Sequence, residues 1–120
     1  MQKQLKKILK VNPKRSIENF GRRCFKLFEE ASEVTTAFLS VTSFGNGKGN
    51  SWDDVREETV DTLIMALDIL YTRLPGEEKL TEEEFAAKVE KIIDQKVKKW
   101  ARQIKEGRDI TMSVDDRFLF

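Results

Sequence analysis

Two clusters of acidic side chains have the composition and spacing of a site for a hard divalent cation. They are Glu29-Glu30-Ala31-Ser32-Glu33 and Glu57-Glu58-Thr59-Val60-Asp61. Residues three apart on a helix project from the same side of it, so Glu30 with Glu33, and Glu58 with Asp61, can each present two carboxylates to a neighbour. If two such helices pack antiparallel, the four carboxylates converge. Mg²⁺ or Mn²⁺, held by carboxylates, waters and substrate phosphates, is the natural cation to place between them.

Chance is the competing explanation, because the chain has 21 acidic residues in 120. Other acidic runs, such as Glu77-Glu78 and Glu82-Glu83-Glu84, are typical of solvated faces and of the first turn of a helix. The two clusters differ from these runs in their position. Each sits in a strongly apolar segment, where a carboxylate without a partner is costly. Their placement, more than their spacing, favours a metal site.

Composition excludes several other kinds of chemistry. The chain has no histidine, which rules out a Ser-His-Asp or Cys-His nucleophile and almost every catalytic zinc site. The single cysteine, Cys24, excludes an internal disulfide and a cysteine metal cluster. Lysine and arginine number 22, which gives a net charge of only +1 and no basic excess for binding a nucleic-acid polymer.

The sequence predicts a single domain over residues 1–120, built from successive helices, and these helices must position the acidic clusters. Residues 1–15 form an amphipathic helix and turn, with an apolar edge of Leu5, Ile8 and Leu9. A long second helix begins at the N-cap Ser16. Its predicted buried stripe consists of Phe20, Cys24, Leu27, Ala31, Val34, Phe38 and Val41, while Phe25, Phe28 and Leu39 lie on another side.

The second half of the chain continues the helical pattern after a glycine-rich loop over residues 42–50. A third helix, capped by Ser51 with Asp54, runs from Trp52 to about Leu74 and is apolar nearly all round, so it should be the most buried. Thr81 and Glu84 form a capping box that opens the last helix, which ends near Gly107 and contains Trp100, predicted to be core. Residues 108–120 form a tail. No period-2 segment is present, so the fold class is all-α.

The order of these motifs resembles the MazG-like, all-α nucleoside triphosphate pyrophosphohydrolases. The resemblance lies in EExxE on one helix, a glycine-containing loop, and Glu58-Thr-Val-Asp61 followed at once by Thr-Leu-Ile-Met-Ala-Leu, and it covers roughly residues 20–74. It implies an antiparallel helical bundle with four main helices, assembled as a dimer or tetramer. It also implies a Mg²⁺-dependent cleavage of a nucleoside triphosphate to the monophosphate and pyrophosphate, for which Mn²⁺ is an alternative cofactor.

Carried over residue by residue, the resemblance assigns Glu30, Glu33, Glu58 and Asp61 as metal ligands. Glu29 completes the motif and would orient the attacking water. A carboxylate held against the metal, such as Glu33, can accept the proton of that water.

Five further residues are candidates for binding the substrate, each with a structural alternative. Lys96 and Lys99 lie on a helix that in the family often supplies phosphate contacts, but lysines in this pattern are more often part of a solvated basic face. Lys48 in the loop can close over phosphates or lie in a plain connector. Trp52 can stack on a base or pack at the helix start. Asp68, two turns after Asp61, can face the ligand or pair with a cation of a neighbouring helix.

Self-association is also expected because the second and third helices carry more apolar surface than one small bundle can cover. No segment approaches the roughly 20 apolar residues of a membrane span, and a chain with one free thiol and no export signal is expected in the cytoplasm.

Two other functions compete with nucleoside triphosphate pyrophosphohydrolysis. One is cleavage of phosphoribosyl-ATP on the same scaffold, and the other is a non-catalytic helical adaptor or regulator whose acids are merely solvated.

Overall fold

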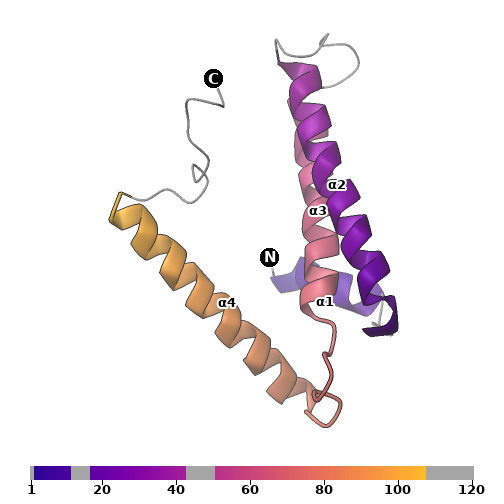
Figure 1. Ribbon diagram of the computed structural model, residues 1–120, viewed down its shortest axis with the longest axis vertical. Coiled ribbons are helices and arrows are strands. Elements are labelled where there is room, and N and C mark those ends of the chain that lie inside the picture. The colour runs from indigo at the N-terminus through magenta and orange to yellow at the C-terminus, as the bar shows by residue number, and fades with distance from the viewer. Residues whose placement is uncertain (1, 12–16, 43–50, 108–120) are drawn as a thin grey trace. The chain divides into compact units, whose positions relative to one another are not determined.

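The computed structural model describes residues 2–11, 17–42 and 51–107, and its regular structure in these ranges is entirely helical (Figure 1). The elements are α1 (Gln2–Val11), the short 3-10 helix η1 (Ile17–Asn19), α2 (Phe20–Val41), α3 (Trp52–Leu70) and α4 (Glu82–Lys105). The predicted all-α class is therefore confirmed for the described residues, which contain four α-helices and no strand. None of these helices is long and apolar enough to cross a membrane.

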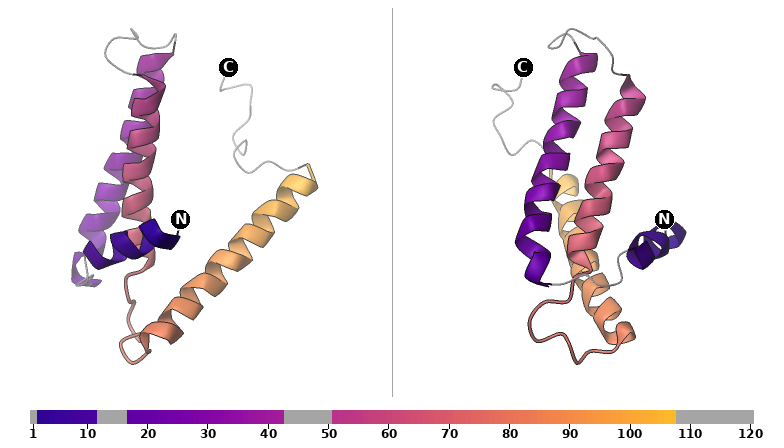
Figure 2. Two further views of the ribbon diagram at one scale, coloured as in Figure 1. Left: turned by 180° about the vertical axis from the view of Figure 1, so that it is seen from behind. Right: turned by 90° about the vertical axis from the view of Figure 1, so that its right-hand side faces the viewer.

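The chain divides into two compact units, Met1–Lys79 and Leu80–Phe120. In the first unit, α2 and α3 run antiparallel and lie side by side along most of their length (Figure 2). Helix α1 also contacts α3, and its predicted apolar edge of Leu5, Ile8 and Leu9 is half-buried. The second unit contains α4. The predicted loop at residues 43–50 and tail at residues 108–120 lie outside the described residues.

The start of α3 has the predicted capping box. The Ser51 hydroxyl accepts a hydrogen bond from the Asp54 backbone N–H, and the Asp54 carboxylate accepts one from the Ser51 backbone N–H at 2.6 Å. These two bonds satisfy N–H groups that have no partner within the helix. By contrast, the predicted N-cap Ser16 lies outside the described residues. Helix α2 begins at Phe20, after the turn of η1, and its N-cap Asn19 makes no side-chain capping bond.

The end of α3 comes earlier than predicted, at Leu70 instead of about Leu74. The hydrogen-bond pattern changes there, because the Thr72 N–H donates to the carbonyl three residues back, that of Ile69, at 3.1 Å. The buried Glu77 then stabilises a turn, since its carboxylate accepts from the Leu74 N–H at 2.7 Å. Gly76 allows this turn with a φ of 93°, a conformation that favours glycine.

The buried face of α2 differs from the predicted stripe by about one residue. Cys24, Ala31 and Phe38 are exposed, whereas Glu30 and Ala37 are buried. The prediction followed apolar character alone. The observed face includes Arg23 and Glu30, because each has a partner of opposite charge. Arg23 pairs with Asp68 of α3, and Glu30 pairs with Lys26 of α2.

Helix α3 is likewise not covered on all sides. Val60, Leu63 and Ile64 are exposed, and the one buried residue among the described positions of α3 is the charged Asp68. Among the described helices α3 still has the smallest share of exposed residues, as expected, but its burial does not extend to all of its apolar sides. Among the described residues of this unit, α3 packs mainly against α2 and also contacts α1.

Helix α4 begins and ends as predicted. The Thr81 hydroxyl accepts from the Glu84 N–H at 3.1 Å, and Glu84 accepts from the Thr81 N–H at 3.0 Å. At the other end Gly107 has a φ of 79° and donates to the carbonyl of Ile104. Phe85 and Val89 are buried, but the apolar stripe beyond them is exposed. That stripe includes Trp100, which was predicted to be core.

Candidate metal centre

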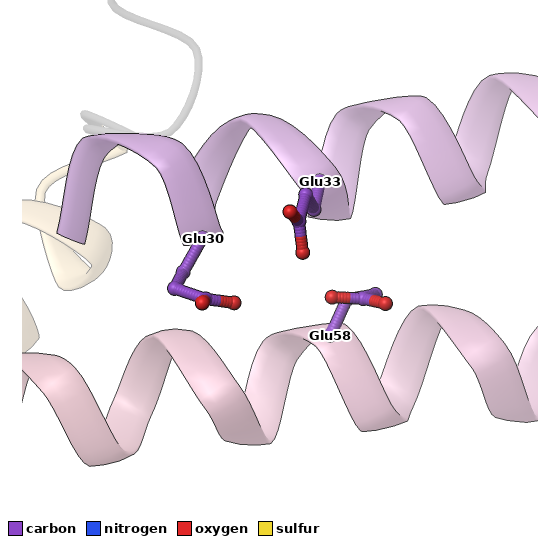
Figure 3. Close-up of side chains that lie close together, drawn as sticks. All are labelled: Glu30, Glu33 and Glu58. Carbon is purple, nitrogen blue, oxygen red and sulfur yellow. The ribbon is translucent and has the colours of Figure 1, made fainter. Parts of the chain in front are cut away.

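Three carboxylates from two helices meet between α2 and α3 (Figure 3). Glu30 and Glu33 project from α2 toward α3, and Glu58 projects from α3 toward them. One carboxylate oxygen from each residue lies within 4.8 Å of those of the other two. Oxygens bound to one divalent ion at about 2.0–2.6 Å are at most about 4–5 Å apart, so one ion can bridge the three.

Helix geometry explains why the sequence brings these side chains together. Glu30 and Glu33 are three residues apart and therefore share one side of α2. The antiparallel packing of α3 then brings Glu58 opposite them. Glu30 is buried, with 9% of its surface exposed, while Glu33 and Glu58 are half-buried.

The metal-free cluster is electrostatically unfavourable. The pKa of Glu58 is raised above its ordinary value of 4.5, first by a hydrogen bond with Glu33 that only a protonated acid can make, then by burial. The negative charges of Glu33, Asp61 and Glu30 raise this pKa further. When the acids are ionised, Glu58 Oε2 is buried without a hydrogen-bond donor among the described residues.

These features fit a hard divalent cation. The donor set consists of carboxylate oxygens alone, which Mg²⁺, Mn²⁺ and Ca²⁺ prefer. A buried carboxylate oxygen without a donor is costly, and a bound cation would remove that cost. The three residues present therefore suit the cation that the sequence predicts.

Asp61, the fourth predicted ligand, lies outside this group. Its side chain is exposed on α3, three residues after Glu58. It is nevertheless close enough for its negative charge to raise the pKa of Glu58. The structure thus brings Glu30, Glu33 and Glu58 together and leaves Asp61 at the edge of the cluster.

Lys26 is a cation beside the cluster that the sequence analysis missed. Its ammonium nitrogen lies 3.0 Å from Glu30 Oε1 and 3.4 Å from Glu29 Oε1. Glu29, which was predicted to orient water, is exposed and engaged with this lysine instead of with the three-acid group. The spacing of Lys26 and Glu30, four residues apart on a helix, is the signal that could have revealed the pair.

Arg23 forms a second interaction that links the two helices and that sequence reasoning missed. Its guanidinium donates to Asp68 Oδ2 at 2.8 Å and to the hydroxyl of the buried Thr72 at 2.7 Å. Asp68 therefore has a cation from a neighbouring helix, which is the structural alternative that the sequence left open. The side chains of Arg23 and Asp68 are each only 12% exposed.

The remaining candidates for substrate binding are Trp52, Lys48, Lys96 and Lys99. Trp52 is 60% exposed and packs against Phe38 of α2, with ring centroids 5.9 Å apart. Lys48 lies outside the described residues. Lys96 and Lys99 are exposed on α4, where they line an open cavity of about 490 Å³ together with Trp100.

Comparisons with protein-family models, with curated proteins and with solved structures gave no match to this chain.

Proposed function

We propose that this chain is a Mg²⁺-dependent nucleoside triphosphate pyrophosphohydrolase of the MazG-like type. The observation that carries the proposal is the convergence of Glu30, Glu33 and Glu58 from two antiparallel helices, with ligand atoms within 4.8 Å of one another. The sequence predicted these three residues as ligands from their spacing and their family resemblance. A site made of carboxylates also suits a chain without histidine, because phosphoryl chemistry depends mainly on positioning and on charge neutralisation.

In this proposal Glu30, Glu33 and Glu58 would hold the divalent ion, which would supply neutralisation of phosphate charge and activation of water. Glu33 would accept the proton of the attacking water. Asp61 adds negative charge one turn along α3 and completes the site when substrate is present. Glu29 remains a predicted water-orienting residue, and Lys48, Lys96 and Lys99 remain predicted phosphate contacts. Asp68 is engaged by Arg23, so we assign it to holding α2 against α3.

The test is pyrophosphate release from a panel of ribonucleoside and deoxyribonucleoside triphosphates with Mg²⁺, with phosphoribosyl-ATP as a separate arm. We expect at least one nucleoside triphosphate to give the monophosphate and pyrophosphate. Turnover of phosphoribosyl-ATP alone would favour the alternative enzyme on the same scaffold. Release from no substrate, with folded protein and millimolar Mg²⁺, would contradict the proposal and favour a non-catalytic adaptor.

Variants connect the activity to the cluster. Glu33→Gln and Asp61→Asn should abolish turnover while the far-ultraviolet circular dichroism stays helical. Glu57→Gln is the matched control, because Glu57 neighbours Glu58 on α3 but is exposed and outside the three-acid group. It should keep wild-type turnover. Full activity in Glu33→Gln would remove that residue from the mechanism.

Assembly as a dimer or tetramer is part of the same proposal. Phe25 and Phe28 of α2 are 78% and 75% exposed, and Val60, Leu63 and Ile64 of α3 are also exposed. Exposed large apolar side chains of this kind favour an interaction surface, and the cover proposed here is a second copy of the chain.

A further inference from the structure

The Lys26 ammonium lies against one of the carboxylates that we assign to the metal. It is 3.0 Å from Glu30 Oε1, and the Glu30 side chain is only 12% exposed, whereas the Lys26 side chain is 47% exposed. The same ammonium reaches Glu29 Oε1 at 3.4 Å. A half-exposed cation is therefore paired with a nearly buried acid of the cluster.

This contact partly compensates the charge of the metal-free site. Glu30 is the most buried of the three acids, and Lys26 is its ion-pair partner. A lysine ammonium is charged at neutral pH, so the pair with Glu30 joins opposite full charges.

We propose that Lys26 is a built-in competitor of the divalent cation: its ammonium occupies Glu30 in the metal-free protein and must be displaced when the ion binds. The inference rests on the proposed function, because it requires Glu30 to be a metal ligand. The physical reason is that a divalent ion on Glu30 and an ammonium on the same carboxylate repel each other. The ion therefore binds only by weakening or breaking the Lys26–Glu30 pair. The site with Lys26 therefore binds the ion less tightly than the three carboxylates would without this lysine.

Removal of this positive charge should therefore tighten metal binding. Lys26→Gln keeps a polar side chain of similar helix propensity but is shorter and has no charge. We expect it to bind Mn²⁺ about tenfold more tightly than the wild type, the order that Coulomb's law gives for a single and a double charge several ångströms apart in water. Lys26→Arg keeps the charge and should stay within about twofold of the wild type.

A matched control separates this local effect from the loss of one charge anywhere on the chain. Lys98 also forms a helical pair with an acid four residues away, at 2.9 Å from Asp94 Oδ2, but it belongs to α4 and its acid is not one of the three carboxylates. Lys98→Gln changes the net charge of the chain by the same amount. It should leave the Mn²⁺ dissociation constant within about twofold of the wild type.

The experiment is a calorimetric titration of Mn²⁺ into the four full-length proteins at one ionic strength, with helical content checked by circular dichroism. Tighter binding in Lys26→Gln alone supports the inference. Equal or weaker binding in Lys26→Gln overturns it but leaves the metal centre standing. Equal tightening in Lys98→Gln or in Lys26→Arg also overturns it. If the wild type binds no Mn²⁺ at millimolar concentration, the metal centre itself fails, and this inference fails with it.

Discussion

Arg23 and Asp68 pair across α2 and α3 in the same register that brings Glu33 opposite Glu58. Glu33 follows Arg23 by ten residues on α2, and Glu58 precedes Asp68 by ten residues on α3. Because the helices run antiparallel, the attractive pair at 2.8 Å and the repulsive acidic pair belong to one alignment of the two helices. The ion pair therefore opposes the repulsion that would separate the helices at the acidic cluster.

Loss of the Arg23 guanidinium should destabilise the protein substantially. Arg23→Ala leaves Asp68 buried without this donor and also removes the bond to the Thr72 hydroxyl. We expect a loss of about 2–3 kcal/mol in the free energy of unfolding, measured with urea. Arg56→Ala is the control. Its pair with Asp53, at 3.8 Å between exposed side chains, should be worth less than about 0.5 kcal/mol. Equal effects of the two variants would contradict a special role for Arg23.

The raised pKa of Glu58 predicts that the metal-free protein loses stability as the pH rises. The folded form binds its proton more tightly than the unfolded chain does, so between the ordinary value of 4.5 and the higher folded pKa the folded state carries more protons. Stability falls across this window as Glu58 ionises. In EDTA, Glu58→Gln should therefore melt at a higher temperature than the wild type at pH 7, and the difference should shrink below pH 4.5. A less stable Glu58→Gln at neutral pH would argue against the electrostatic strain.

The capping box of α4 predicts the opposite dependence on pH. The backbone N–H and the hydroxyl of Thr81 lower the pKa of Glu84, so its contribution to stability is present above 4.5. That contribution is lost as the pH falls through the folded pKa. A carbon-13 titration of the Glu84 carboxyl should show a midpoint below 4.5. Thr81→Ala removes the hydroxyl but keeps the backbone N–H, so it should move this midpoint only part of the way back. Thr81→Ala should also cost about 1 kcal/mol of helix stability. A midpoint that Thr81→Ala leaves in place would contradict the assignment.

The exposed phenylalanines of α2 predict self-association. Light scattering should give the wild type a mass that is a multiple of the 14.0 kDa chain. Phe25→Glu with Phe28→Glu places two charges in the apolar patch and should lower that mass. Arg56→Glu, at an exposed position of α3, is the control and should not lower it. A monomeric wild type would contradict the proposed assembly.

The sequence was a good guide to features that depend on local chemistry. Both capping boxes were predicted correctly, because their bonds join residues only three apart. The grouping of Glu30, Glu33 and Glu58 was also predicted, because helical spacing and an antiparallel neighbour suffice to place them.

Features that depend on tertiary pairing were predicted less well. The packed face of α2 was misplaced because it contains Arg23 and Glu30, whose burial depends on Asp68 and Lys26. The spacing of apolar residues cannot predict the burial of a charged residue that forms an ion pair. The position of Asp61 at the edge of the cluster likewise depends on how α3 is rotated against α2, which spacing alone does not fix.

The most direct test of the metal centre is anomalous scattering from crystals of the protein grown with Mn²⁺. The account predicts an anomalous peak between α2 and α3, within about 2.0–2.3 Å of carboxylate oxygens of Glu30, Glu33 and Glu58. Crystals of Glu33→Gln grown in the same way should show a weakened or absent peak. A wild-type crystal in millimolar Mn²⁺ with no ion between these three carboxylates would contradict the account.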